Sequence, residues 1–486
     1  MPSPPARLTW AETRRKLAHM AAFWPALCLP WLSPAQALGV TFLLLIMNVF
    51  ILPRAARGLY RDLDPGRGEL EIILYPAALM ACVIAFGTYG AFGPSGAGLG
   101  KPAWYLPVMA AWFALACVDA CIGFACRLLP IGPALPWNPR KPALAVALGA
   151  AAAFSLAWLL IHGMAAFPSL YGIGSGIGSG IASGQDGLPA GSAGLWTAVA
   201  LFIAIAALAE TAWFGIADNL VIPFSVCALA PLIPNPAWVA YELPGLTWYW
   251  ACAPAAFGIL AYAAGLLTPG GSLLGAFLSL LLVLANPWLF AFLCGFFALG
   301  NLATRFGAAR KRALGLAEAR GGRRGAAEVF GAMGMAAWMT PLAHATGSMA
   351  PAFGEPRAAL LVCIAPLVAK TMDTVSSEIG KAMGGRTLSL RSFRPVPPGA
   401  EGGVSVAGTL AGLTAAGAMA LAILPLGWGG PLDVAALMIF AVAANLFESY
   451  WGEWAARKGL EAGAHTNVLM TLAAAVPAWL WWFTAS

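Results

Sequence analysis

The sequence predicts an all-α, polytopic integral membrane protein with about 13–15 transmembrane helices in two bundles. Of its 486 residues, 60% are hydrophobic and only 10% are charged, whereas a soluble domain carries about 25% charged residues. The mean hydropathy is +0.79, and apolar runs recur at the length of about 20 residues that crosses a bilayer. Too few charges are present to cover the surface of soluble domains of this total length.

Fifteen apolar runs account for the expected helices. Three of them, 17–32, 220–235 and 272–286, are short enough to be re-entrant segments or half-helices. In chain order the runs cover 17–32, 35–52, 70–90, 103–122, 142–166, 195–217, 220–235, 246–267, 272–286, 288–304, 326–346, 357–379, 403–426, 432–455 and 466–484.

Cysteine and histidine patterns exclude several kinds of site. Most of the nine cysteines lie inside apolar runs, without a CxxC pair or zinc-type spacing, which is typical of small buried residues. The four histidines are far apart in the sequence. A zinc site or a Ser-His-Asp triad is therefore not expected.

The positions of the basic residues predict the orientation in the membrane. With fifteen spans, 24 of the 27 lysines and arginines fall in loops on one side. The positive-inside rule makes that side cytoplasmic. We therefore expect a multi-pass protein of the cell membrane with its active face toward the cytoplasm.

Acidic residues gather at the same face. Eight of them lie in or at the ends of apolar runs, each toward the expected cytoplasmic end, although a carboxylate within a membrane is costly. They are Asp119, Glu210, Asp218, Glu328, Asp373, Glu378, Glu448 and Glu453. Solvation at helix ends would explain any one of them, but the outer ends are nearly free of acids.

One face thus combines carboxylates, which suit Mg²⁺, with arginines and lysines, which suit phosphates. This combination predicts a cytoplasmic-facing site for a phosphorylated, metal-bound ligand. Attraction to lipid headgroups would explain the basic loops alone, but it would not require the acids.

A first constellation lies in the N-terminal half. Asp119 at a helix end is followed 22 residues later by Lys141, which opens the next helix after the turn signal Asn138-Pro139 and Arg140. A second polar break follows at Asp218. Together these residues could hold a metal ion and a phosphate.

A denser constellation closes the run at 357–379. Lys370, Asp373 and Ser377 have the spacing of one helix face. Glu378 lies five residues after Asp373 and would meet a shared metal from an oblique angle. An amphipathic helix end is the simpler alternative, but so many polar residues are unusual within an apolar run.

The loop that follows is rich in arginine, proline and glycine. Glycines let backbone N–H groups approach an anion at the start of the next helix. The residues of interest there are Arg391, Arg394, Gly399, Glu401, Gly402, Gly403 and Ser405.

The first half, residues 1–240, resembles the membrane superfamily of dolichol kinase, phytol kinase and CDP-diacylglycerol synthase. The matching residues are Arg15, Lys16, His19, Tyr75, Pro76, Asp119, Gly123, Pro136, Trp137, Asn138, Pro139, Arg140, Lys141, Asp218, Asn219, Leu220 and Pro223. After Lys141 the superfamily usually has an acidic residue and a glycine, whereas this sequence continues Pro142-Ala143-Leu144-Ala145.

The second half, residues 246–486, resembles the family known as domain of unknown function 92, which includes plant phytyl-phosphate kinase and transmembrane protein 19. The matching residues lie in 304–325, 373–381, 396–405, 448–449 and at Asn467. The segment Gly331-Ala332-Met333-Gly334 departs from the family, which commonly has an Asn-Gly pair there.

The two resemblances imply a Mg²⁺-dependent phosphotransferase that uses CTP or another nucleoside triphosphate. The second half would convert an isoprenyl monophosphate to the diphosphate, and the first half an isoprenoid alcohol to the monophosphate. Catalytic roles would fall to Asp373, Glu378, Lys381, Asp119 and Lys141, and metal binding to Asp373, Glu378, Glu448, Asp119 and Asp218. Phosphate or nucleotide binding would fall to Arg391, Arg394, Gly399, Glu401, Gly402, Gly403, Ser405, Arg305, Asn138 and Arg140.

Two other functions stay open at this point. A cytidylyltransferase would make a CDP-lipid and release pyrophosphate, whereas a kinase releases CDP. A transporter or flippase of a phosphorylated lipid would place charges near the midplane, whereas the acids here gather toward one face. We expect the bilayer, an isoprenoid lipid and a nucleotide as partners, and no nucleic acid; the sequence does not indicate an oligomeric state.

Overall fold

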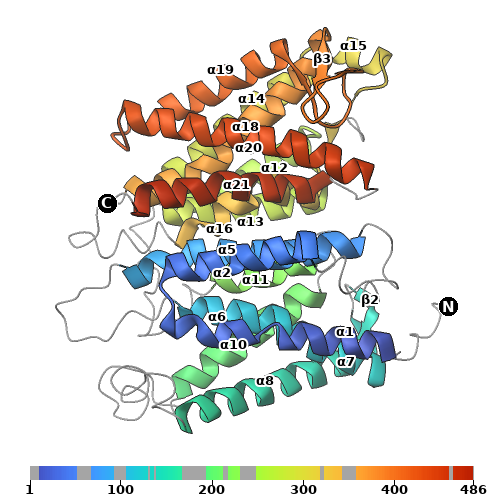
Figure 1. The fold of residues 1–486 in the computed structure, drawn as a ribbon, viewed down its shortest axis with the longest axis vertical. Coiled ribbons are helices and arrows are strands. Elements are labelled where there is room, and N and C mark those ends of the chain that lie inside the picture. Colours follow the sequence, from blue (N-terminus) through green and yellow to red (C-terminus); the bar gives the residue numbers. More distant parts are fainter. Residues whose placement is uncertain are drawn as a thin grey trace. The chain divides into compact units, whose positions relative to one another are not determined.

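The computed structural model confirms the all-helical, polytopic class. It describes residues 10–51, 67–91, 105–129, 132–135, 138–166, 193–211, 217–229, 248–317, 322–341, 357–458 and 463–484. The chain divides into two compact units, one of residues 1–63 and 71–242 and the other of residues 64–70 and 243–486. Each unit is a bundle of helices (Figure 1).

The described residues contain six helical segments that are long and apolar enough to cross a membrane. These are Pro34–Ile51, Pro107–Leu128, Ala143–Ile161, Pro287–Arg305, Arg357–Met383 and Pro431–Arg457. Six shorter apolar helices accompany them. The larger count of 13–15 spans stays a prediction.

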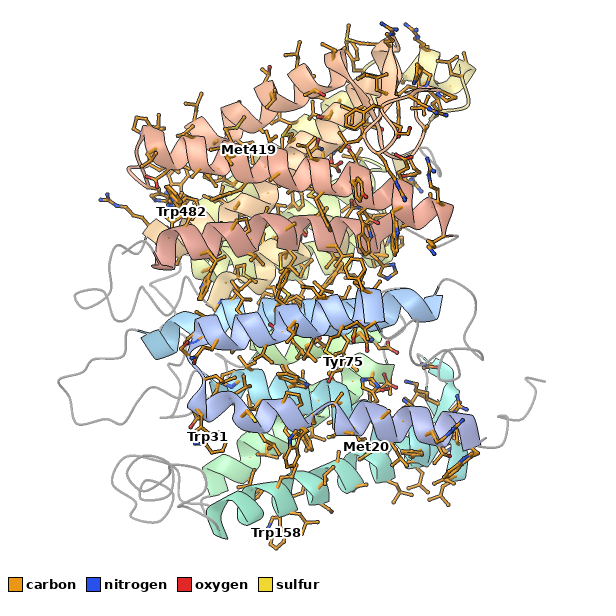
Figure 2. All side chains as sticks on the ribbon, viewed as in Figure 1. Met20, Trp31, Tyr75, Trp158, Met419 and Trp482 are labelled. Atoms are coloured by element: carbon orange, nitrogen blue, oxygen red, sulfur yellow. The ribbon has the colours of Figure 1, made fainter. Side chains whose placement is uncertain are left out.

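Apolar side chains cover the outer surface of the helix bundles and also fill the contacts between helices. Trp31 and Trp158 are among many large apolar residues that are exposed, and Figure 2 shows Trp158 pointing away from the bundle. Tyr75 is buried within the first unit. An apolar exterior around a packed interior is what a bilayer environment requires.

The first unit consists mainly of helices. Its elements are α1 (Trp10–Ala21), the 3₁₀-helix η1 (Trp24–Trp31), α2 (Pro34–Ile46), the π-helix η2 (Met47–Ile51), α5 (Arg67–Ala91), α6 (Tyr105–Phe113), the π-helix η3 (Ala114–Val118), α7 (Asp119–Leu128), β1 (Ala134–Leu135), β2 (Asn138–Pro142), α8 (Ala143–Ala166), α10 (Ala193–Thr211) and α11 (Asp218–Leu229).

The candidate membrane span Pro107–Leu128 is formed by α6, η3 and α7. Its π-helical turn, η3, ends directly before Asp119. Such π-helical turns occur frequently at functional sites. The short strands β1 and β2 pair antiparallel, with Leu135 opposite Asn138. This hairpin leads Lys141 directly into α8.

The second unit contains α12 (Trp248–Ala263), α13 (Pro269–Ala285), α14 (Pro287–Arg305), α15 (Ala308–Ala313), α16 (Ala326–Trp338), α18 (Arg357–Met383), β3 (Thr387–Ser389), β4 (Pro395–Val396), β5 (Gly403–Ser405), α19 (Val406–Leu421), α20 (Pro431–Arg457) and α21 (Gly463–Thr484). The apolar runs expected at 272–286 and 288–304 are separated at Pro287, which begins α14. After α14, Gly307 adopts a positive φ of 61°.

Helix α18 is the centre of this unit. It contacts α14, α16, α19, α20 and α21, and 94% of its most apolar window is buried. Gly408 and Gly412 of α19 lie against the backbone of α18 at Ser376 and Met372, where a Cβ would collide. Small residues four apart allow such close helix approach in membranes.

A three-stranded sheet covers one end of the bundle. Strand β3 pairs antiparallel with both β4 and β5, and Leu388 lies opposite Pro395 and Val404. Figure 1 shows β3 and α15 at the same end of the unit. The sheet therefore holds the proline- and glycine-rich loop above the polar end of α18.

Candidate functional site

The central polar cluster of the second unit joins α18 to α21. Lys370 Nζ donates to Asp373 Oδ2 at 2.5 Å and to Asn467 Oδ1 at 2.6 Å. Lys370 and Asp373 are both buried. The helical spacing inferred from the sequence thus brings the two together, and Asn467 arrives from a helix about 100 residues further along the chain.

Two more carboxylates approach this cluster. A Cβ at Gly452 would lie 3.5 Å from Glu401 Oε2 and 3.7 Å from Glu448 Oε1, so the two acids face the same point of α20. Glu448 also interacts electrostatically with Asp373 and Lys370. The helix bundle, which is otherwise apolar, therefore holds the carboxylates of Asp373 and Glu448 close to the ammonium of Lys370 and the amide oxygen of Asn467.

Glu378 belongs to a separate ion-pair cluster. Its Oε2 pairs with Lys311 Nζ of α15 at 2.6 Å, and its Oε1 pairs with Lys381 Nζ at 3.2 Å. Lys311 also donates to the carbonyl of Thr304, at the end of α14, at 2.7 Å. Glu378 and Lys311 are each only 2% exposed. Both carboxylate oxygens of Glu378 are thus occupied by protein cations.

The glycines of the loop allow a close approach to α20. Gly399 and Gly402 have positive φ angles of 82° and 74°, which favour glycine. A Cβ at Gly402 would lie 2.6 Å from the carbonyl of Ser449 and 2.7 Å from Glu453 Cβ. Gly403 pairs with Ser389 in the sheet. These glycines place Glu401 beside Glu448.

Glu453 fixes the same loop to α20. Ser389 Oγ donates to Glu453 Oε2 at 2.7 Å, and Arg457 pairs with Glu453 Oε1 at 2.5 Å. Ser389 Oγ in turn accepts from the backbone N–H of Ser392 at 3.0 Å. We therefore read Glu453 as an anchor for the loop.

Three of the arginines expected to bind phosphate are exposed. They are Arg391, Arg394 and Arg305. The Arg391 guanidinium lies 5.9 Å from the ring centroid of Tyr450, which orients it over α20.

Ser405 has a local role, since its Oγ accepts from the N–H of Gly408 at 3.2 Å and caps α19.

The first unit has a polar cluster of its own, near the π-helical turn. Lys16 Nζ of α1 pairs with Asp119 Oδ2 at 3.0 Å, and His19 Nδ1 lies 3.5 Å from the same oxygen. The Lys-Leu-Ala-His motif and the Asp motif, about 100 residues apart in sequence, therefore meet.

Lys141 completes this cluster from the hairpin. Its Nζ pairs with Glu210 Oε1 at 2.6 Å, and Asn138 donates to the carbonyl of Thr211 at 3.0 Å. Burial by itself lowers the pKa of Lys141, but the neighbouring Glu210 carboxylate outweighs burial and raises that pKa. Asp218, at the start of α11, interacts electrostatically with both.

One oxygen of Glu210 has no N–H or hydroxyl donor. The side chain is 6% exposed, and its Oε2 is buried without such a donor within reach among the described residues. The Glu210 carboxyl does hydrogen-bond to the Asp119 side chain. A buried polar atom without such a donor is costly, so this oxygen is a candidate for contact with a ligand or a proton.

Several residues of these clusters had no expected site role. Lys370, Asn467, Lys16 and His19 were named in the sequence motifs without one. Glu210 was named only among the eight acids near helix ends, and its pairing with Lys141 was not expected. Lys311 was indistinguishable from six other basic residues between Arg305 and Arg324. The side chain of Arg140 lies outside the described side chains.

The residues do not form a ready-made metal cage. In the parts of the chain that the structure describes, no three His, Cys, Asp or Glu side chains are grouped to hold a metal ion. Asp373, Glu378, Asp119 and Glu210 each pair with a lysine. An ion held mainly by phosphate oxygens would need only one or two protein carboxylates, so Mg²⁺ binding stays a prediction.

Comparison with known proteins places the second unit among membrane proteins. The family described as integral membrane protein DUF92 matches residues 252–475. An uncharacterized membrane protein of Synechocystis, sll0875, is 38% identical over 189 residues, which are 37% of this chain and 69% of that protein. Protein VTE6, chloroplastic, of Arabidopsis thaliana is 37% identical over 34% of this chain and 48% of its own length.

A third relative is archaeal. The uncharacterized membrane protein MJ0933 of Methanocaldococcus jannaschii is 30% identical over 24% of this chain and 48% of its own length. The chain thus spans about half the length of two of these relatives. No solved structure matches the chain.

Proposed function

The chain belongs to the DUF92 family of integral membrane proteins. From the resemblance to phytyl-phosphate kinase and from the polar cluster of the second unit, we propose that it transfers a phosphoryl group from a nucleotide to an isoprenyl monophosphate. The observation that carries the proposal is the buried cluster of Lys370, Asp373 and Asn467, with Glu448 beside it. Burying such groups in an apolar bundle is costly, and phosphoryl transfer gives them a use.

The proposed reaction is chiefly a matter of positioning and charge neutralisation. An oxygen of the acceptor monophosphate forms the new bond to the γ-phosphorus of CTP. The bond from that phosphorus to the bridging oxygen breaks, and its electron pair leaves with CDP. The acceptor oxygen is already anionic, so this step needs no general base.

Residues of the second unit would divide the work. Asp373 and Glu448 would meet a Mg²⁺ ion carried by the nucleotide. Lys370 uses two of its three N–H donors within the protein, so one is left for a phosphate oxygen. Arg391 and Arg394 would bind further phosphate oxygens from the loop.

For the first unit we propose transfer to an isoprenoid alcohol, and the observation that favours it is the buried Oε2 of Glu210, which has no N–H or hydroxyl donor and lies in a carboxyl hydrogen-bonded to Asp119. A hydroxyl acceptor, unlike a phosphate, has a proton to lose as the new bond to phosphorus forms. Glu210 would accept that proton, while Lys141 and Lys16 would neutralise phosphate charge.

The test uses the purified full-length protein in detergent with Mg²⁺. CTP labelled at the γ-phosphate and CTP labelled at the α-phosphate are each incubated with an isoprenyl alcohol or an isoprenyl monophosphate, and the lipids are then separated. We expect γ-label in both lipid products and no α-label. An α-labelled lipid with release of pyrophosphate would instead establish cytidylyl transfer, and unlabelled lipids with every nucleotide tried would favour transport.

Two isosteric variants assign the steps to the units. Asp373→Asn should abolish labelling of the monophosphate acceptor, and Glu210→Gln should abolish labelling of the alcohol only. Each variant serves as the control for the other, because each should retain the reaction of the intact unit. A folded and fully active Asp373→Asn protein would refute the role of the central cluster.

A further inference from the structure

Phe393 lies in the turn between β3 and β4, in an unusual backbone conformation. Its φ is 53°, and no other non-glycine residue in the described ranges has a positive φ. This left-handed region is costly for a residue with a large side chain, and glycine would adopt it without that cost. Folding of the turn therefore does not explain a phenylalanine here, and residues held in such conformations cluster at functional sites.

The ring of Phe393 is exposed, and two exposed arginines flank it. Phe393 is 77% exposed, the largest value among the exposed large apolar residues of the described chain, so packing against the protein stabilises the ring little. Arg391 and Arg394 are exposed as well, and neither pairs with a carboxylate of the described residues. The turn thus presents an aromatic ring between two guanidinium groups that no carboxylate neutralises.

Hydrogen bonds hold this turn against α20. Phe393 N–H donates to the carbonyl of Ser389, and Ser389 N–H donates to the carbonyl of Arg394, both at 2.9 Å. Ser389 Oγ donates to Glu453 Oε2 at 2.7 Å, and the backbone N–H of Arg391 donates to the same carboxylate. The backbone that carries the ring is therefore fixed before a ligand binds, which lowers the entropic cost of binding.

The turn lies close to the proposed reaction centre of the second unit. Glu453, which holds the turn, follows Glu448 by five residues on α20, a distance of about 7.5 Å along the helix axis. Gly452 faces both Glu448 and Glu401, and Glu448 interacts electrostatically with Asp373. The ring is therefore carried near the carboxylates that would meet the Mg²⁺ of the nucleotide.

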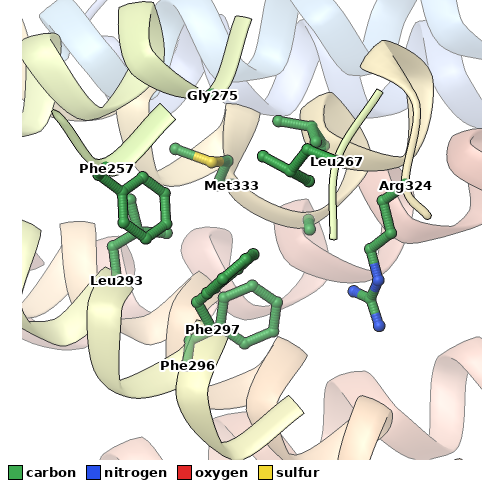
Figure 3. Close-up of a pocket in the computed structure, with 10 residues that line it drawn as sticks. Phe257, Leu267, Gly275, Leu293, Phe296, Phe297, Arg324 and Met333 are labelled. Atoms are coloured by element: carbon green, nitrogen blue, oxygen red, sulfur yellow. The ribbon is translucent and has the colours of Figure 1, made fainter. Parts of the chain in front are cut away.

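An apolar pocket elsewhere in the second unit is too small to take a nucleobase. It lies between α12, α13, α14 and α16, and Phe257, Leu267 and Met333 are among its lining residues (Figure 3). Its cavity volume is about 30 Å³, which is room for about one water molecule. A nucleobase needs a more open surface, such as the ring of Phe393.

We propose that the ring of Phe393 stacks on the base of the nucleotide, while Arg391 and Arg394 bind its phosphates. Every nucleobase has a π-face, and stacking on an aromatic side chain stabilises binding without hydrogen bonds. A guanidinium matches phosphate oxygens. The inference rests on the proposed function, because it places the base of the same phosphoryl donor.

Equilibrium dialysis of the purified full-length protein in detergent, with Mg²⁺ and without acceptor lipid, tests the inference. The two probes are CTP and inorganic triphosphate, which carries three phosphates but no base. Phe393→Leu should weaken CTP binding about tenfold, the effect of losing one stacked base, and leave triphosphate binding unchanged. Phe393→Tyr keeps an aromatic ring and is the matched control, with a CTP affinity close to that of wild type.

A further variant separates the ring from the backbone conformation. Phe393→Gly should weaken CTP binding as much as Phe393→Leu does. Its melting temperature in detergent should be no lower than that of wild type, because glycine adopts a positive φ without strain. Weaker CTP binding by a protein of undiminished stability is a loss of contact with the nucleotide and not a loss of fold.

Two results would overturn the stacking role while leaving the proposed function intact. Phe393→Leu could bind CTP as tightly as wild type does, which would leave the ring to the lipid interface. It could also lose triphosphate binding as much as CTP binding, which would place the effect on the phosphates. Failure of the proposed function is distinct, because wild type would then neither bind CTP nor transfer its γ-label to the acceptor, and both ideas would be refuted together.

Discussion

Replacing Lys311 by methionine separates two roles for Glu378. If Glu378 mainly holds α15 and the end of α14 onto α18, the loss of Lys311 should destabilise the protein, because a carboxylate that is 2% exposed would lose its nearest cation. If Glu378 mainly binds the metal of the nucleotide, stability should change little.

The magnitude follows from the burial of the pair. Removing one partner of a buried ion pair costs about 3–5 kcal/mol. Lys381 remains 3.2 Å from the other carboxylate oxygen, so we expect the lower end, about 3 kcal/mol. For a unit of this size that corresponds to a fall in melting temperature of about 6–12 °C.

The measurement is thermal unfolding of the full-length protein in detergent for wild type, Lys311→Met, Glu378→Gln and the double variant. The double variant should be less destabilised than the sum of the single variants, because the charge and its partner are removed together. Arg312→Met is the matched control: Arg312 is the next residue of α15 and is exposed, so its loss should cost less than about 0.5 kcal/mol.

A Lys311→Met protein as stable as the Arg312→Met control would refute the reasoning. A destabilised protein that still transfers phosphate at the wild-type rate below its melting temperature would confirm the structural role of the pair. It would also leave Asp373 and Glu448 as the carboxylates for Mg²⁺.

Three further predictions concern the cap of α19, the packing of α18 and the metal. Ser405→Ala removes the hydroxyl that accepts from Gly408 N–H, so the free energy of unfolding should fall by about 1 kcal/mol; an unchanged melting temperature would contradict this. Gly412→Leu puts a side chain against the carbonyl of Met372, so α19 should separate from α18, and loss of the folded peak on gel filtration would report this. Gly417→Leu is the matched control on the same helix, because a Cβ there would meet only the flexible end of Met438, at 4.0 Å. Chelation of Mg²⁺ should stop transfer of the γ-phosphate and leave the melting temperature unchanged, and restored Mg²⁺ should restore transfer; transfer that persists in excess chelator would refute the use of a nucleotide-borne metal.

The fold class could be predicted from the sequence because each membrane helix is indicated by the residues of its own segment. Apolar runs of about 20 residues and breaks at proline and glycine determine where helices such as α13, α14 and α18 begin and end. The pairing of Lys370 with Asp373 was also predictable, since three residues of spacing place both on one helix face.

Partners from distant parts of the chain were decided by the tertiary structure. Asn467 reaches Lys370 from α21, Lys311 reaches Glu378 from α15, and Lys16 reaches Asp119 from α1. Helical periodicity specifies the face on which a side chain lies, but it does not specify which helix packs against that face. The sequence by itself therefore determined the helices and the polar residues they carry, and only the packing of the bundles decided which charges neutralise one another.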